Sequence, residues 1–383
     1  MMRPSFALPL LIAALTPGAA LRSQHPDNSV RVALGFGVDT LGTSREIFAL
    51  WRNYLSSGPG CSQQSSLWAP SELAQWSVVD LLCSYVYQGF SRFTVVHLAP
   101  AVGLDSTYMI RTLVATVSDS ARDVYPLALF RVYATREQGR WVLANALPRL
   151  TRDWNHEGIG RVQFVFPATR RFARDRAAAT SAFVDSLAAA FQVSPPASIG
   201  YYFTNDLIQT LSAAGLEFFP LGADTVGGRA DTINRLVFVG SSSRGEEYRH
   251  ELAHVVLGPF LAPFRPAGLV QEGLMTWTGG SAGLTFNQLM PALNGYLSTH
   301  ADLTLASILT DPPSRTGTLD VGYDGLAVLC KMAYDAGGLP AIRELAGAGR
   351  EPRAVLGAAA RILKVSESQL DTLWRRRVAD LAR

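Results

Sequence analysis

The sequence is poor in cysteine, in charge and in long apolar runs. Of its 383 residues only three are cysteines and 17% are charged, and its formal net charge is +3. Arginine is spread along the chain without a dense basic cluster, so we expect no nucleic-acid partner. Beyond the N-terminal residues, no apolar run is long enough to cross a bilayer, which predicts no stable membrane span. The 48% of hydrophobic residues nevertheless suffice for the cores of two ordinary domains.

Three cysteines cannot all pair within one chain. Cys61 and Cys83 lie in the same N-terminal region, where an oxidising compartment would let them close a loop. Cys330 lies in an apolar helical stretch, which favours a buried free thiol. The sequence has no CxxC pair, so a cysteine-ligated metal has no support.

The N-terminus has the pattern of a secretory signal peptide, which we expect over residues 1–22. Arg3 supplies a positive charge, residues 6–15 form a short apolar stretch, and Gly18-Ala19-Ala20 offers small residues for cleavage. The alternative is an uncleaved anchor, but the stretch is short for a membrane span and prolines interrupt it. The pattern therefore predicts a secreted or periplasmic protein.

Residues 23–155 are expected to form an N-terminal α+β module. Thr43 opens a predicted helix and Pro70 a shorter one towards Leu82. Runs rich in β-branched and aromatic residues follow, at residues 93–98, 108–117, 127–134 and 140–147. The turn at residues 136–139 joins the last two as a hairpin. A curved antiparallel sheet covered by helices is similar to the cone-shaped NTF2-like fold.

Residues 156–383 are expected to form a second domain, after a polar, turn-rich boundary at 152–160. Strands are predicted at Val162–Phe166, Ile199–Phe203 and Leu236–Val239, with helices between them. Glu246 and Glu247 favour the start of a helix. The remainder reads as helical, at residues 246–258, 267–278, 286–297, 322–336, 339–346 and 366–381. A small sheet followed by a helical half again indicates an α+β fold.

His250, Glu251 and His254 belong to an intact HExxH motif, His-Glu-Leu-Ala-His. On a helix, residues four apart leave the same face, about 40° apart around the axis and about 6 Å apart along it. Both imidazoles can therefore reach one zinc ion (Zn2+), while Glu251 points beside that face and can touch a metal-bound water. Gly258-Pro259 is expected to end the helix.

Glu272 is the candidate third ligand, eighteen residues after His254 in the segment Gln-Glu-Gly-Leu. Three prolines force a loop between the two, and a second helix is predicted to begin near Ala267. A helix that runs back against the first would present Glu272 to the metal. Two histidines, one glutamate and an open position for water are typical of catalytic zinc.

With these residues the sequence resembles the gluzincin metallopeptidases, and more narrowly the peptidase MA-like domains. The resemblance implies three zinc ligands: His250, His254 and Glu272. It also implies Glu251 as catalytic base and Arg235–Gly240 as an edge strand that pairs with the substrate backbone. Thermolysin-like relatives hold a ligand histidine with an Asp four residues after the ligand Glu. Here Thr276 occupies that position, so the outer partners of the ligands are still to be identified.

The expected function is hydrolysis of peptide bonds in peptide or protein substrates. Zinc would lower the pKa of its water, and Glu251 would take the proton and pass it to the leaving amine. The oxyanion needs a further donor. Related enzymes often use a Tyr or His from the helical half, and the candidates are Tyr323 first and His300 next. The oligomeric state is not predicted.

Two other hypotheses for the function stay open. One is an inactive metallopeptidase-like protein that serves as an envelope binding or scaffold protein. The other places the function in the N-terminal module, as a pocket for a small ligand or partner. A serine hydrolase is excluded, because the GxSxG at Ser281 needs an acid and then a histidine after it, and only His300 follows, with no acid between. These glycines are expected to end the Glu272 helix.

Overall fold

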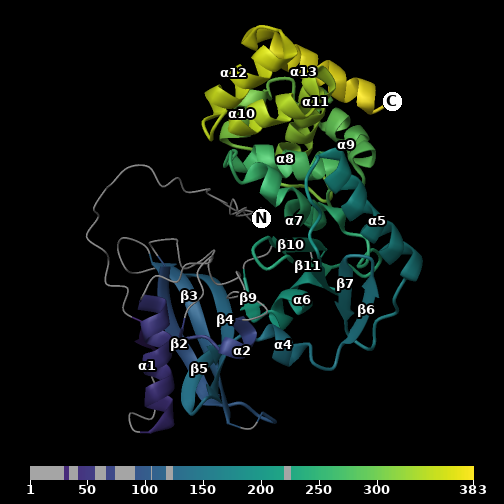
Figure 1. Cartoon of the computed structure of the whole chain (residues 1–383). Coiled ribbons are helices and arrows are strands. Elements are labelled where there is room, and N and C mark those ends of the chain that lie inside the picture. The colour runs from purple at the N-terminus through teal and green to yellow at the C-terminus, as the bar shows by residue number, and fades with distance from the viewer. Residues whose placement is uncertain are drawn as a thin grey trace, which may run out of the picture. The chain divides into compact units, whose positions relative to one another are not determined.

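The computed structural model describes residues 30–33, 42–56, 66–73, 91–104, 106–117, 124–219 and 226–383. The predicted signal peptide, Cys61 and Cys83 lie outside these residues. The chain has an α+β fold and divides into two compact units (Figure 1). We call them the sheet unit, which contains the described residues up to Ser181 together with Pro196–Glu247, and the helical unit, which contains Ala182–Pro195 and Tyr248–Arg383.

The first sheet of the sheet unit has the strand order β1-β2-β3-β4-β5, with β9 paired to β4. Its strands are β1 (Arg31–Val32), β2 (Ser91–Pro100), β3 (Thr107–Val117), β4 (Val124–Glu137), β5 (Arg140–Ala144) and β9 (Leu216–Phe218). All pairs are antiparallel except β1 with β2. The predicted strands and the hairpin between β4 and β5 are confirmed. The hairpin turn has two residues, Gln138 and Gly139, both with positive φ.

Helix α1 (Thr43–Ser56) packs on one face of this sheet, as predicted. Its Trp51 is fully buried and donates a hydrogen bond from Nε1 to Thr112 Oγ1 on β3 at 2.8 Å. Ile110 and Val114 flank Thr112 and are buried with it, because alternate residues of a strand share a face. The helix predicted from Pro70 is described as α2 (Pro70–Leu73), and a short helix α4 (Leu147–Leu150) follows β5.

The second sheet has the order β10-β11-β8-β7-β6. Its strands are β6 (Asn155–Ile159), β7 (Val162–Phe166), β8 (Ile199–Thr204), β10 (Gly227–Asp231) and β11 (Leu236–Gly240), and α5 (Arg174–Ala190) and α6 (Leu207–Ala213) accompany them. The boundary predicted at 152–160 as a turn-rich segment contains β6. Along the chain, this segment separates strands β1 to β5 of the first sheet from the rest of the second sheet, and both sheets belong to one compact unit. The predicted division into domains stays a prediction.

The strand predicted as a substrate-binding edge is inside the sheet. β11 pairs with β8 on one side and with β10 on the other. All five of its residues are buried, since an apolar run without alternation needs cover on both faces. The edge strand next to β11 is β10, whose sequence Gly-Gly-Arg-Ala-Asp carries no strand pattern and was not predicted.

The helical unit is built from helices α7 to α13 and the second half of α5. They are α7 (Arg249–Leu261), α8 (Gly268–Gly279), α9 (Phe286–Thr299), α10 (Leu305–Thr310), α11 (Val321–Gly347), α12 (Pro352–Leu363) and α13 (Glu367–Leu381). Phe191, after α5, packs its ring on Phe260 of α7, and Trp277 of α8 packs on Tyr334 of α11. Trp374 of α13 is fully buried and donates to Gly325 O.

Several helix limits differ from the prediction. α7 continues through Pro259 to Leu261, because Phe260 and Leu261 are buried and their packing outweighs the proline. Glu246 precedes α7 instead of opening it, and its buried carboxylate accepts from Ala173 N–H and pairs with Arg176 in the sheet unit. The break predicted between 336 and 339 is a kink at Gly338 within α11. α10 and α12 were not predicted.

Across the described ranges, no helix has the length and apolar character needed to cross a bilayer. Cys330 is a buried free thiol, as predicted.

Candidate metal centre

Helix α7 carries the HExxH motif near its N-terminus. His250 and His254 are one turn apart, and their rings lie 5.1 Å apart between centroids. The helix is apolar on nearly every side and is deeply buried, so its direction is set by packing around the whole helix. His250 and Glu251 keep only 6% and 7% of their surface exposed, which places both in a largely dry environment.

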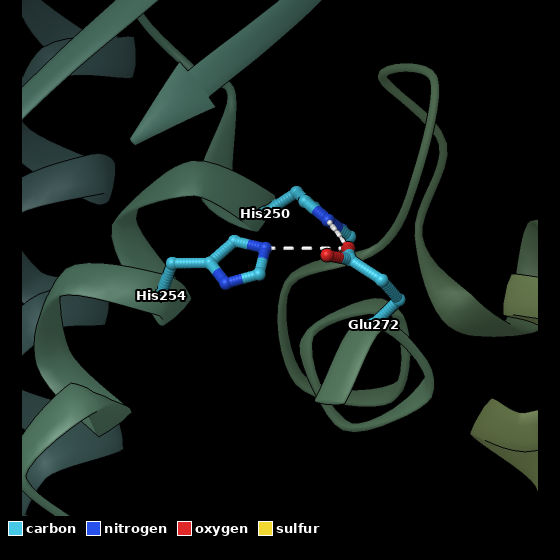
Figure 2. A group of neighbouring side chains, drawn as sticks. All are labelled: His250, His254 and Glu272. Atoms are coloured by element: carbon cyan, nitrogen blue, oxygen red, sulfur yellow. Dashed lines mark hydrogen bonds and ion pairs between the residues drawn. The ribbon is translucent and has the colours of Figure 1, made fainter. Parts of the chain in front are cut away.

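Helix α8 brings Glu272 to both histidines. Glu272 Oε2 lies 3.1 Å from His250 Nε2 and 3.3 Å from His254 Nε2. Figure 2 shows the two imidazoles leaving one helix and converging on the carboxylate of the next. Candidate ligand atoms of the three side chains all lie within 4.8 Å of one another. The predicted helix start near Ala267 agrees with α8, for which Ala267 is the N-cap residue.

The spacing of these atoms fits a tetrahedral zinc ion. Zinc binds imidazole nitrogen and carboxylate oxygen at about 2.0–2.2 Å, and neighbouring ligands of such a tetrahedron are about 3.3 Å apart. The two distances to Glu272 Oε2 are close to that value. The donor set of two nitrogens and one oxygen is one that zinc accepts, and it leaves a fourth position for water.

The second ring nitrogen, Nδ1, of each imidazole also has a neighbouring polar group. His250 Nδ1 lies 2.8 Å from Gly280 O, and because a carbonyl only accepts, Nδ1 carries a proton. This fixes the tautomer that offers Nε2 to a metal. The amide of Gln271 is 3.3 Å from His254 Nδ1. The atom in this contact is the amide nitrogen Nε2, which donates towards Nδ1. Only the flipped amide, with its oxygen in that place, would accept from Nδ1–H and leave Nε2 to a metal. These two outer partners were missed from the sequence.

Two glycines allow α8 to approach its neighbours. A Cβ on Gly279 would lie 2.8 Å from the backbone of Arg249 and 2.9 Å from His250 Cα. A Cβ on Gly273 would lie 2.6 Å from Leu326 on α11. Helix α8 therefore touches α7 near His250 and touches α11 beside Glu272. Neither contact has space for a side chain on α8.

Tyr323 lies beside this group. The Tyr323 ring is parallel to the His250 ring, with centroids 6.1 Å apart. Burial raises the pKa of Tyr323, and the charges of Glu272, Asp320 and Glu251 add to the increase. Its phenol therefore keeps its proton and remains a hydrogen-bond donor at neutral pH. The predicted oxyanion donor is thus next to the ligands, in the first turn of α11.

The electrostatics of the side chains favour a carboxylate paired with a protonated imidazole. Burial alone would lower the pKa of His250, but the hydrogen bond to Glu272 and the charges of Glu251 and Glu272 raise it to about 9. Burial alone would raise the pKa of Glu272, and the neighbouring His254 and His250 hold it far below its ordinary range. A metal ion would take the place of the proton between them.

Two further acids lie at the start of α11. Asp320 Oδ1 caps the helix by accepting from Tyr323 N–H at 3.0 Å. Asp324 is fully buried, and its Oδ2 accepts from Asp320 N–H at 3.2 Å. Burial, and then the charge of Asp320, raises the pKa of Asp324 to about 8, while Arg315 and His250 oppose the increase. Neither acid was singled out from the sequence.

The other sequence candidates lie elsewhere. His300 ends α9, where its Nδ1 donates to Tyr296 O and its ring stacks on the Tyr296 ring. Among the residues described, it joins no metal-binding group. The glycines around Ser281 end α8 at Gly279, as predicted, and Gly280 has a φ of 81°. The role of His250, His254 and Glu272 as ligands, and of Glu251 as base, stays a prediction.

The sequence matches no protein-family profile and no curated protein. The likeness to the gluzincins thus rests on the His-Glu-Leu-Ala-His and Gln-Glu-Gly-Leu segments of this chain alone, and it stays a prediction.

Replacing Gly279 by alanine should weaken the candidate metal site, although Gly279 is not a candidate ligand. The new methyl group would meet backbone atoms of Arg249 and His250, which cannot rotate away, so α8 must move from α7. We expect a loss of about 1–3 kcal/mol in the free energy of unfolding, together with weaker metal binding. Urea unfolding and chelator competition measure the two effects.

Gly295→Ala is the matched control, since Gly295 is in α9 with nothing within 4 Å of an added Cβ. Alanine there should stabilise the chain by up to about 1 kcal/mol. Equal behaviour of the two variants would contradict the close contact.

Asp324 should make the metal-free chain less stable as the pH rises. The carboxyl group has its ordinary pKa of 3.8 when unfolded and about 8 when folded. Between these values the unfolded chain gives up a proton that the folded chain keeps, so stability falls with increasing pH. Each pKa unit corresponds to about 1.4 kcal/mol. Asp324→Asn does not ionise, and its advantage over the wild type should grow from pH 4 to pH 8. Urea unfolding across this range tests it, and a difference independent of pH would contradict it.

Proposed function

We propose that this chain is a zinc-dependent peptidase that cleaves peptide bonds in peptide or protein substrates. The observation that carries the proposal is the convergence of His250, His254 and Glu272 in one group, with the buried Glu251 next to His250 on the same helix. The donor types, their spacing and the hydrogen bond between His250 and Gly280 O fit zinc. Export from the cytoplasm is part of the proposal and rests on the signal-like N-terminus.

In this proposal, His250, His254 and Glu272 would hold the ion through Nε2, Nε2 and Oε2. Gly280 O orients His250 and fixes the tautomer that offers Nε2 to a metal. Gln271 contacts Nδ1 of His254. A bound zinc ion would supply a Lewis acid that polarises a carbonyl and lowers the pKa of water.

Glu251 is the proposed proton carrier. It follows His250 on α7 and its charge raises the pKa of both His250 and Tyr323, which places it close to the ligand group. Its carboxylate takes a proton from the attacking water and delivers it to the leaving amine. Because Glu251 is nearly excluded from solvent, that proton is not lost to bulk water.

Tyr323 is the proposed donor to the carbonyl oxygen of the scissile bond. Its phenol keeps its proton and lies against the His250 ring, on the opposite helix from Glu251. A donor held in place before the reaction stabilises the negative charge that develops on this oxygen.

Changing Glu251 to glutamine should separate metal binding from turnover. The amide has the same shape but cannot accept the proton, so hydrolysis should fall by about 10²–10⁴-fold while zinc remains bound. Zinc per chain by elemental analysis and cleavage of a fluorogenic peptide library measure the two properties. Glu344→Gln, an exposed acid of α11 that pairs with Arg361, is the control for loss of charge. Retained hydrolysis in Glu251→Gln would overturn the assignment of the base.

Removing the third ligand should weaken zinc binding strongly. Glu272→Ala leaves only two imidazoles, and we expect zinc affinity to fall by more than the roughly 10–100-fold typical of outer-partner variants. Competition with a chromophoric chelator gives the affinity, with His300→Ala as the control because His300 is outside the metal-binding group. Unchanged affinity in Glu272→Ala would place the third ligand elsewhere. One zinc per wild-type chain with no cleavage of any peptide would favour the scaffold hypothesis.

A further inference from the structure

The face of the first sheet that lies opposite helix α1 carries a pair of like charges. Thr112 of β3 faces α1, where Trp51 donates to it, so its neighbours Arg111 and Leu113 leave the other side of the strand. Arg111 pairs directly with Arg131 of β4 on that side. Like charges directly opposite each other on neighbouring strands destabilise a sheet. The arginine pair therefore needs a reason other than strand pairing.

Glu217 of β9 compensates only part of this charge. Its Oε2 lies 2.8 Å from Arg111 Nε, and its Oε1 accepts from Arg111 Nη2 at 3.1 Å and also pairs with Arg131 Nη2. Two guanidinium groups and one carboxylate leave one net positive charge. His97 pairs with Arg111 from β2 and adds no charge at neutral pH, because burial and then the charge of Arg111 lower its pKa. The row from His97 to Glu217 therefore attracts an anion.

The two guanidinium groups also have donors to spare. Each carries five N–H groups in a planar fork, and the contacts with Glu217 use three of their six nitrogen atoms. Nε of Arg131 is buried and has no hydrogen-bond partner among the described residues. Both side chains are partly open to solvent, with 34% of Arg111 and 20% of Arg131 exposed. A further carboxylate can accept from such a pair.

Apolar side chains flank the arginine pair on both sides, and one of the two sides is open. Met109 pairs with Tyr133 on the first side, and both belong to a small apolar cluster that buries Tyr133. On the second side Leu113 pairs with Leu129, and both are only half-buried. Phe218 of β9 pairs with Leu129 and keeps 45% of its surface exposed. This side therefore presents an apolar strip that ends at the two arginines.

We propose that this face binds an amphipathic carboxylate, a small molecule with an apolar chain and a terminal carboxylate, such as a fatty acid. The carboxylate accepts from Arg111 and Arg131 and offsets the repulsion between them. The chain lies over Leu113, Leu129 and Phe218 and removes their exposed surface from water. A small inorganic anion lacks the chain and a neutral lipid lacks the charge. The inference goes beyond the proposed peptidase function and does not rest on it.

Calorimetric titration of the full-length chain with octanoate tests the proposal, and octanol and acetate probe its two halves. Octanoate should bind saturably. Octanol should bind about tenfold or more weakly, because it cannot make the charge-assisted hydrogen bonds to the arginines. Acetate, which has no chain, should show no binding. Absence of octanoate binding, or equal affinity for octanol and octanoate, would overturn the proposal.

Arg111→Gln tests the charged half of the site. The variant leaves Glu217 paired with Arg131, and its affinity for octanoate should fall by about tenfold or more while its affinity for octanol is unchanged. Arg140→Gln is the matched control, because Arg140 is an exposed arginine of β5 in the same sheet. Urea unfolding establishes that both variants are folded. Equal losses in the two variants would mean attraction to positive charge in general and would contradict a site at Arg111.

Two further variants locate the bound chain. Phe218→Ser should weaken the binding of octanoate, whereas Ile233→Ser, with 43% of a similar apolar residue exposed on the second sheet, should leave it unchanged. Glu272→Ala should also bind octanoate as the wild type does. A loss of octanoate binding in Glu272→Ala would assign the carboxylate to the candidate metal centre and overturn this inference.

Discussion

The backbone of α8 touches the backbone of α7 at Gly279 and that of α11 at Gly273, and the candidate site depends on these two contacts. Glu272 directly precedes Gly273, so its carboxylate is held against His250 and His254 by helix packing rather than by a loop. The same approach places Gly280 O on His250 Nδ1 and the Tyr323 ring against the His250 ring. A side chain at either glycine would separate these groups.

Local patterns predicted the elements that carry the ligands. The spacing of His250 and His254 requires only the geometry of one helix, and Pro263 and Pro266 marked the loop that returns Glu272. Ser366 and Gln369 form a capping box at the start of α13, as their spacing indicated. These signals involve residues that are near one another in the chain, where sequence and geometry are directly linked.

The rest depended on contacts between distant residues. The partners of the imidazoles are a backbone carbonyl and an amide, which have no pattern of their own. β10 forms because it pairs with β11, and α7 continues past Pro259 because the Phe260 side chain is buried. Asp324 is an ordinary acid in the sequence. Its burial exists only once the helices of this unit have packed together.

Within the described residues, the chain passes three times between its two units, after Ser181, after Pro195 and after Glu247. During synthesis, Phe191 leaves the ribosome well before Phe260 and Trp277, the aromatic residues on which it packs. The helical unit cannot close its core until its last helices are made, and the sheet unit must wait for β10 and β11. Such interleaving gives both units a high contact order and slow folding. The segments that wait for their partners therefore expose apolar residues to chaperones during translation.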